Sequence, residues 1–259
     1  MAARSVGRPA LVAVAHGSRD PRSAATVFAL IERVQALRPD LTVRLCFLDL
    51  NTPRLPDVLT SVAEEGHRAA VVVPLLLGRA FHAKVDVPGA VARAARRHPS
   101  LRLSVADVLG RDDRLADTAL LRLGAVAGPL DASELGVVLS SVGSSHPEAN
   151  DAVQGLVSGW STRYGWSGGV AAFGTAASPT VPEAIDRLRA AGAERIAVAS
   201  WFLAPGLIPE RVLDAVRRNA PEVPVADPLG SDRAVAEVVL DRYLAVARSE
   251  AIPRLQHVS

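Results

Sequence analysis

The stretch Leu11–Pro21 reads LVAVAHGSRDP, and it decides how the rest of the chain is interpreted. A run of apolar, strand-forming residues stops at His16, and a Gly-Ser-Arg-Asp-Pro sequence follows directly. Such a run, ended by glycine and a small polar residue before an amphipathic segment, is typical of a buried parallel strand that enters a helix. Open α/β sheets bind ligands at the carboxyl ends of their strands. His16 is therefore predicted to stand where the chemistry of such a protein takes place.

The composition is that of a large globular α/β protein. The chain has 259 residues, of which 49% are hydrophobic and only 4% aromatic. The formal net charge is +2 and no basic tract is present, so we expect no nucleic-acid partner. The single cysteine, Cys46, excludes an internal disulfide and a cysteine-based zinc cluster. No apolar run has the length of a membrane span or of a signal peptide's apolar core, so we expect a cytoplasmic protein with no membrane partner.

Segments of strand and helix character alternate along the chain. Strands are predicted at 10–15, 42–48, 69–77, 101–106, 135–141, 169–173, 195–203 and 223–226. Helices are predicted at 23–37, 55–65, 87–97, 112–127, 148–163, 181–191, 208–219 and 232–248. A linker, AGPLDASE, occupies Ala127–Glu134. This alternation predicts parallel sheets covered by helices on both faces.

The two halves of the chain match each other residue by residue. A shift of 126 positions, without a gap, pairs Gly17 with Gly143, and the further matches fall at strand ends and turns. Near the end of each half, VADVLGRD at Val105–Asp112 matches VADPLGSD at Val225–Asp232 in six of eight positions, with the shift reduced to 120. These matches predict a duplicated α/β domain.

The two copies, residues 1–127 and 135–259, differ in their ionisable residues. At the shift of 126 the differing pairs are His16 with Val142, Asp49 with Thr175, Arg79 with Pro205, His82 with Ile208 and Lys84 with Glu210. The second copy keeps the turns and the apolar pattern but has lost the ionisable residues of the first copy at these junctions. We therefore expect one site per chain, carried by the first copy, with the degenerate repeat as the opposing wall.

Two histidines lead the candidate site residues. His16 and His82 each follow a buried strand, so both are expected at one edge of one sheet. Two imidazoles there can bind a divalent metal or accept protons near neutral pH, although either histidine alone could be a hydrogen-bonded structural residue. Asp49, just after the second strand, would add a carboxylate to this edge or would instead cap the helix that starts near Leu55.

Side chains suited to an anionic ligand surround these histidines. Ser18 and Arg19 precede a helix, where a hydroxyl and backbone N–H groups can hold an anion, and Ser18 or Asp20 can also cap that helix. Arg79 and Lys84 flank the second histidine, and Lys84 is the only lysine of the chain. Guanidinium groups match carboxylate geometry, so a carboxylate-bearing ligand is favoured. The sequence has no G-x-x-x-x-G-K-[ST] phosphate loop, so we expect no nucleotide cofactor.

Three stretches together resemble the sirohydrochlorin chelatases, which belong to the class II chelatases. That family has a strand-end His followed by Gly-Ser, an acidic residue in a Phe-Leu-Glu segment, and a His followed by an Asp-Ile-Pro-like turn. The corresponding residues here are His16-Gly17-Ser18, Phe47-Leu48-Asp49, and His82 with Asp86-Val87-Pro88. The resemblance covers the first half closely and the second as a degenerate repeat, as in the family's long two-domain form. In two departures, Asp49 replaces the usual glutamate, and GRAF precedes His82 in place of a glycine-rich segment.

The resemblance implies an α/β fold of two similar chelatase-like domains, each a four-stranded parallel sheet with helices on both faces, and a cleft between them. It implies ATP-independent insertion of Fe²⁺ or Co²⁺ into sirohydrochlorin, the tetrapyrrole that leads to sirohaem or cobalamin. In that reaction the metal would be delivered, and two ring protons taken up, by His16 and His82 with help from Asp49. The ring carboxylates would be held by Ser18, Arg19, Arg79 and Lys84.

Two other functions stay open at this point. A metal or tetrapyrrole carrier would keep both histidines but bind ring or metal without turnover. A hydrolase on another α/β scaffold would need a nucleophile elbow, and none is recognised. The physiological metal also stays open, because histidine and carboxylate ligands accept both iron and cobalt. Since an internal duplication removes the need for a second subunit to close the cleft, we expect a monomer.

Overall fold

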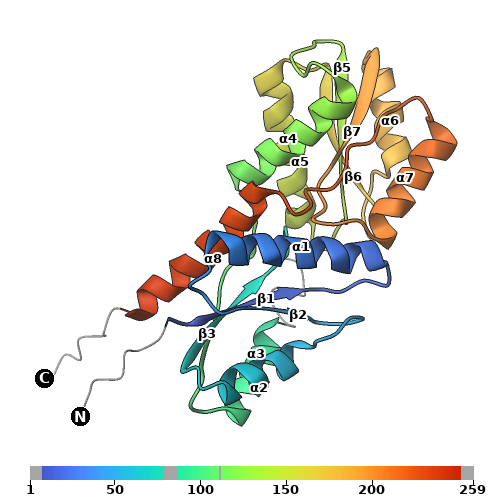
Figure 1. Ribbon diagram of the computed structural model, residues 1–259. Helices are drawn as coiled ribbons and strands as arrows, with labels where there is room; N and C mark the ends of the chain where they lie inside the picture. Colours follow the sequence, from blue (N-terminus) through green and yellow to red (C-terminus); the bar gives the residue numbers. More distant parts are fainter. Residues whose placement is uncertain (1–7, 79–86, 111, 252–259) are drawn as a thin grey trace, which may run out of the picture. The chain divides into compact units, whose positions relative to one another are not determined.

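The computed structural model describes residues 8–78, 87–110 and 112–251 and contains two parallel β-sheets flanked by helices (Figure 1). The predicted α/β class with two similar sheets is confirmed. Within the described residues, none of the helices combines the length and the apolar character needed to cross a membrane.

The first sheet has four parallel strands in the order β2-β1-β3-β4. The strands are β1 (Ala10–Ala15), β2 (Val43–Phe47), β3 (Ala69–Pro74) and β4 (Arg102–Val105). The helices that follow the first three are α1 (Pro21–Leu37), α2 (Leu55–Glu64) and α3 (Val87–Arg97). Every residue of the central strands β1 and β3 is buried, as expected for Val- and Ala-rich strands covered on both faces.

The second sheet has three strands in the order β6-β5-β7, so the expected fourth strand is missing. Its strands are β5 (Leu135–Ser141), β6 (Gly168–Phe173) and β7 (Arg195–Ser200), and the helices that follow them are α5 (Pro147–Tyr164), α6 (Val181–Ala190) and α7 (Leu207–Asn219). The predicted strand at 223–226 makes only one parallel bridge, between Val198 and Val225. Pro224 lies in this segment and has no N–H to donate, whereas its counterpart in the first half, Ser104, pairs within β4.

The internal repeat predicted from the sequence is visible in the backbone. Positive φ angles recur 126 residues apart, at Leu50 and Ala176 and at Gly17 and Gly143, and the peptide bonds before Pro53 and Pro179 are both cis. The helices that follow β3 and β7, however, begin 120 residues apart, at Val87 and Leu207. The register therefore changes by six residues in the loop before these helices. Ile208 and Glu210 lie in α7 and therefore correspond to Pro88 and Ala90, so the gap-free pairing of these two positions with His82 and Lys84 is wrong. The pairing of Arg79 with Pro205 lies outside the described residues.

The chain forms two compact units that divide it differently from the linear repeat. Over the described residues, one unit comprises 8–17, 28–78, 87–110 and 236–251, and the other comprises 18–27 and 112–235. The helix that ends each repeat therefore belongs to the unit built on the other repeat's sheet. These two helices are α4 (Asp113–Ala127) and α8 (Arg233–Ala251).

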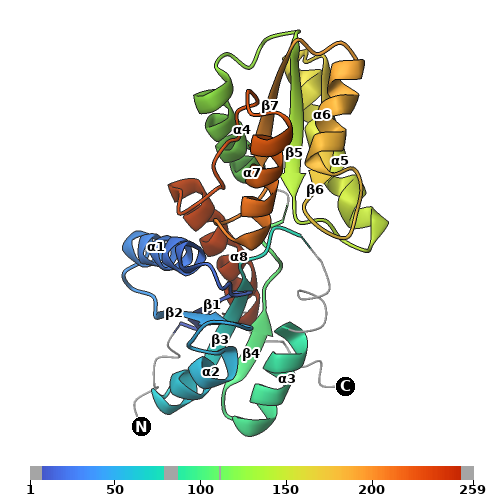
Figure 2. The same ribbon diagram turned by 90° about the vertical axis from the view of Figure 1, so that its right-hand side faces the viewer.

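Matching arginines attach the two exchanged helices. In the first unit, Arg242 of α8 donates to the carbonyls of Val108 and Leu109 at 3.0 and 2.7 Å, and the buried Tyr243 donates to the Pro9 carbonyl at 2.7 Å. In the second unit, α4 packs against β7 (Figure 2), and Arg122 donates to the Leu229 carbonyl at 3.3 Å. Arg122 and Arg242 lie 120 residues apart, at equivalent positions of the repeat. The same side chain thus performs the same task twice.

Candidate functional site

The residues after β1 and β2 are held side by side by backbone hydrogen bonds that continue beyond the two strands. The N–H of Leu48 donates to the Ala15 carbonyl, and that of Asp49 donates to the His16 carbonyl, each at 2.9 Å. The side chain of His16 is exposed, as is that of Asp49. The predicted placement of an imidazole and a carboxylate at the carboxyl edge of one sheet therefore holds for this pair.

Gly17 is required by the close approach of these two loops. Its φ of +99° is strained for a residue with a side chain, and a Cβ built on it would lie 1.8 Å from the carbonyl oxygen of Asp49. The second half repeats this arrangement, since a Cβ on Gly143 would lie 2.1 Å from the carbonyl oxygen of Thr175. The glycine after His16 thus sets the spacing between the histidine loop and the aspartate loop.

The Asp49 carboxylate is ionised and oriented by its neighbours. A hydrogen bond from the Leu50 N–H has the largest effect on the pKa of this carboxyl group and lowers it. Burial, the next largest effect, opposes this, and Arg54 and then the nearby His16 imidazole lower the pKa further. Arg54 lies 3.1 Å from it and also donates to the Leu48 carbonyl at 3.1 Å. The N-cap residue of α2 is Arg54, so Asp49 does not occupy the capping position that the sequence left open.

Asp20, rather than Ser18, caps α1. Its carboxylate accepts the N–H of Arg22 at 2.9 Å, with Pro21 in the first helical position. The hydroxyl of Ser18 accepts the N–H of Asp20 at 3.1 Å, which closes the turn between strand and helix. Ser18 is half-buried and Arg19 is exposed, so both lie at the surface beside His16.

Three predicted site residues, Arg79, His82 and Lys84, lie outside the described residues. In the part of the chain that the structure describes, no three His, Cys, Asp or Glu side chains gather in a way that could hold a metal ion. His16 and Asp49 supply one imidazole and one carboxylate, which are ligand types that divalent first-row metals accept. What the described residues offer is therefore part of a donor set together with an ionised base.

Two arginines that matter here were not singled out from the sequence. Arg54 pairs with Asp49, and Arg22 pairs with Asp20 and Glu210. Nothing distinguishes them from the many other arginines until the loops are folded. Two open grooves, of about 470 and 350 Å³, are lined by other residues of the second unit and by none of the predicted site residues. They do not coincide with the edge that carries His16.

The expectation that the sequence holds no nucleophile-elbow motif is wrong, because Gly165–Gly169 reads GWSGG and has the G-x-S-x-G spacing. In the structure it connects the end of α5 to β6, which is the reverse of the strand-to-helix order that exposes a nucleophile. The hydroxyl of Ser167 is buried. A serine hydrolase site is therefore not present at this motif.

Comparison with known proteins connects this site to a family. The family described as CbiX matches residues 10–125 and, a second time, residues 136–246. The chain belongs to the CbiX family. The two matches are consecutive and together span most of the sequence, so both halves carry the CbiX pattern.

Relatives and a solved structure extend this finding over almost the whole length. A sirohydrochlorin ferrochelatase of Bacillus subtilis (strain 168) is 26% identical over 243 residues, which cover 93% of this CbiX-family chain and 92% of that protein. A sirohydrochlorin cobaltochelatase of Priestia megaterium is 23% identical over 211 residues, covering 79% and 67%. The structure of SirB from Bacillus subtilis with Fe³⁺ superposes with a TM-score of 0.80 at 26% identity, covering 94% of this chain and 97% of that one.

Proposed function

We propose that this CbiX-family chain inserts a divalent metal ion, Fe²⁺ or Co²⁺, into sirohydrochlorin without ATP. The observation that carries the proposal is the exposed His16 imidazole beside the ionised Asp49 carboxylate at the carboxyl edge of the first sheet, in a chain similar throughout to sirohydrochlorin chelatases. Metal insertion exchanges one M²⁺ for two protons of the ring nitrogens. A site for it therefore needs donors for the incoming metal and a base for the outgoing protons.

His16 suits both parts of this exchange. A neutral imidazole binds first-row divalent metals and accepts a proton near pH 7. We assign delivery of the metal to His16 and His82. The ionised Asp49 carboxylate stabilises the imidazolium formed when His16 accepts a ring proton, since opposite charges at short distance favour the charged form. Arg54 holds that carboxylate in place. The metal is a substrate in this scheme, not a resident cofactor.

The ring carboxylates are assigned to the surface beside His16. Ser18 supplies a hydroxyl, and Arg19 supplies an exposed guanidinium group whose geometry matches a carboxylate. Arg79 and Lys84 are assigned the same role on sequence grounds. We also propose that the chain arose by duplication, with 1–127 carrying the site and 135–259 the degenerate copy, acting as a cytoplasmic monomer. Two consecutive family matches and backbone landmarks 126 residues apart support the duplication.

Anaerobic absorbance spectroscopy of sirohydrochlorin with Co²⁺ or Fe²⁺ tests the proposal directly. Catalytic amounts of the protein are expected to accelerate metal insertion over many turnovers, and His16→Ala and His82→Ala are expected to abolish the acceleration. His146→Ala is the matched control, because His146 is an exposed histidine before the corresponding helix of the second half. Binding of ring or metal in a one-to-one ratio without turnover would instead identify a carrier. Absence of any binding would overturn the proposal.

A further inference from the structure

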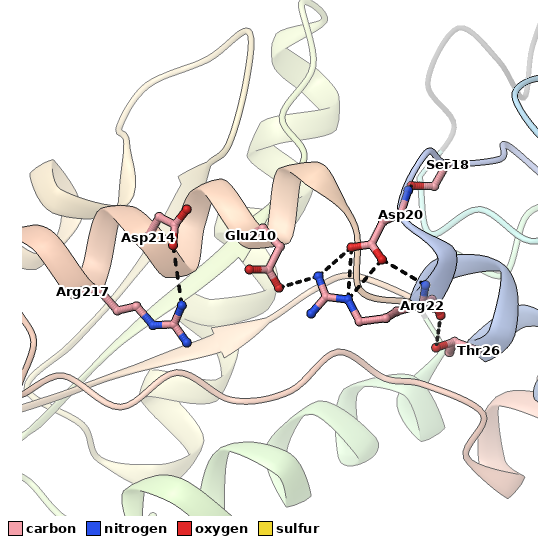
Figure 3. A network of polar contacts seen from close by, with 7 residues as sticks. All are labelled: Ser18, Asp20, Arg22, Thr26, Glu210, Asp214 and Arg217. Carbon is pink, nitrogen blue, oxygen red and sulfur yellow. Dashed lines mark hydrogen bonds and ion pairs between the residues drawn. The ribbon is translucent and has the colours of Figure 1, made fainter.

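A polar network joins the first turn of α1 to the first turn of α7, within the second compact unit (Figure 3). Arg22 donates to the Asp20 carboxylate through Nε at 3.0 and 3.2 Å and through Nη2 at 2.6 Å. The same Nη2 atom lies 2.8 Å from a carboxylate oxygen of Glu210. The side chain of Asp20 is only 8% exposed, whereas those of Arg22 and Glu210 are 56% and 34% exposed, so a buried carboxylate is held by an arginine that reaches the surface.

Ser18 lies near the start of α7. A Cβ built on Gly206, the N-cap residue of α7, would lie 3.6 Å from the Ser18 hydroxyl oxygen, which is ordinary van der Waals contact. The N–H of Glu210 donates to the Gly206 carbonyl at 2.9 Å, which places Glu210 in the turn that Gly206 begins. The segment from Ser18 to Arg22 therefore runs past the first turn of α7 and is joined to it by the ion pair between Arg22 and Glu210.

Among the described residues, the start of the corresponding helix α5 has no equivalent network. At the shift of 126, His146 and Glu148 take the positions of Asp20 and Arg22, and His146 makes no side-chain cap of α5. The structural counterpart of Glu210 is Ala90. The network thus accompanies only the turn that carries His16 and Ser18, as the ionisable site residues do.

We propose that Arg22 is a positioning residue for the ring-binding part of the site. It clamps Asp20 and Glu210 together, and thereby fixes Ser18 and Arg19 in the orientation that receives a ring carboxylate. Arg22 itself contacts neither ring nor metal in this scheme. The inference rests on the proposed function, since it concerns how that substrate is held.

The role makes a specific kinetic prediction. Loss of the clamp leaves His16 and Asp49 where they are, because their backbones are joined by hydrogen bonds in the first unit. Arg22→Ala is therefore expected to raise KM for sirohydrochlorin about tenfold, or about 1.4 kcal/mol. Both kcat and KM for Co²⁺ should stay within about twofold. A lysine at this position can pair with Glu210 but cannot form a bidentate pair with Asp20, so the KM of Arg22→Lys for sirohydrochlorin should lie between those of the wild type and Arg22→Ala.

The control is an ion pair on α7, the helix that carries Glu210. Arg217 and Asp214 of α7 are 3.6 Å apart on an exposed surface, and they belong to no network with Ser18 (Figure 3). Arg217→Ala is expected to leave every kinetic constant unchanged. Glu210→Ala should raise KM for the ring as Arg22→Ala does, and the double variant should be no worse than Arg22→Ala alone, since both substitutions break one clamp. Circular dichroism verifies that each variant is folded.

The possible results separate this inference from the proposed function. If the wild-type protein turns over and Arg22→Ala lowers only kcat, or changes nothing, the inference is overturned while the function stands. Should the wild type bind sirohydrochlorin without turnover, the dissociation constant of the ring replaces KM, and a tenfold rise in Arg22→Ala still supports positioning. If the wild type neither turns over nor binds the ring, both are overturned.

Discussion

Substitution of Gly17 by alanine tests the geometry of the candidate site most sharply. The added Cβ would lie 1.8 Å from the Asp49 carbonyl oxygen, and ordinary contact begins near 3.4 Å, so the two loops must separate by about 1.6 Å. A positive φ costs a residue with a side chain about 1–2 kcal/mol, and overpacking against neighbouring atoms costs about 1–3 kcal/mol. We therefore expect a loss of about 2–5 kcal/mol in the free energy of unfolding.

Two glycines of the same chain serve as controls. Gly66 has a φ of +87° but nothing within 4 Å of a built Cβ, so Gly66→Ala should cost only the strain of about 1–2 kcal/mol. Gly143 has a φ of +90° and a contact of 2.1 Å with the Thr175 carbonyl oxygen, so Gly143→Ala should destabilise the protein as much as Gly17→Ala. Thermal and urea unfolding followed by circular dichroism would measure these differences.

Activity separates the two crowded glycines. Displacing His16 relative to Asp49 by more than 1 Å is expected to lower metal insertion about 100-fold in Gly17→Ala protein that is still folded. Gly143 lies beside Val142, which takes the position of His16 in the second half, so Gly143→Ala should lower the rate of metal insertion less than tenfold. A Gly17→Ala protein with the stability of Gly66→Ala and wild-type activity would refute the reasoning, because the close approach would then impose no constraint.

The remaining predictions concern ionisable groups away from the site. Arg38 lies 2.8 Å from Asp40 and, with help from Arg8, lowers the pKa of the Asp40 carboxyl group from 3.8 to about 2. The ionised carboxylate therefore stabilises the fold above pH 3.8, and this contribution is lost as the pH falls toward 2. The difference in Tm between the wild type and Asp40→Asn should therefore shrink between pH 5 and pH 2, and a constant difference would contradict this. Burial raises the pKa of the Cys46 thiol, which donates to the Ala13 carbonyl at 3.4 Å, so a thiol reagent should modify it only as fast as the protein unfolds. Rapid labelling without denaturant would show that the thiol is accessible.

Local patterns sufficed for the elements and for part of the site. The strand Ala10–Ala15 and the helix Val87–Arg97 have the predicted bounds, because a continuous apolar run and a 3.6-residue period each report on neighbouring residues alone. The same holds for the exposed His16 after its strand. The prediction of a fourth strand in the second sheet was wrong, because it followed the apolar residues Val223 and Val225 and ignored the missing N–H of Pro224.

Contacts between distant segments could not be read from local patterns. The pairing of Arg22 with Glu210 joins residues almost 190 positions apart, and the position of Arg54 beside Asp49 depends on the path of one loop. The position of the six-residue change of register could not be predicted either, since a gap-free shift of the first half aligns the two halves equally well until the lengths of the loops are known. The exchange of α4 and α8 left no trace in the periodicity, because an amphipathic helix shows which face is buried but not which sheet buries it.

That exchange gives a structural role to the second copy, which has Val142 and Thr175 in place of His16 and Asp49. The helix α8 is encoded by the degenerate repeat, yet it belongs to the unit that holds His16, where Tyr243 and Arg242 fasten it. Cutting the chain at the linker Ala127–Glu134 would separate the first sheet from α8 and the second sheet from α4. Each half of the chain therefore supplies a helix that the sheet of the other half needs, so neither half is a self-contained unit.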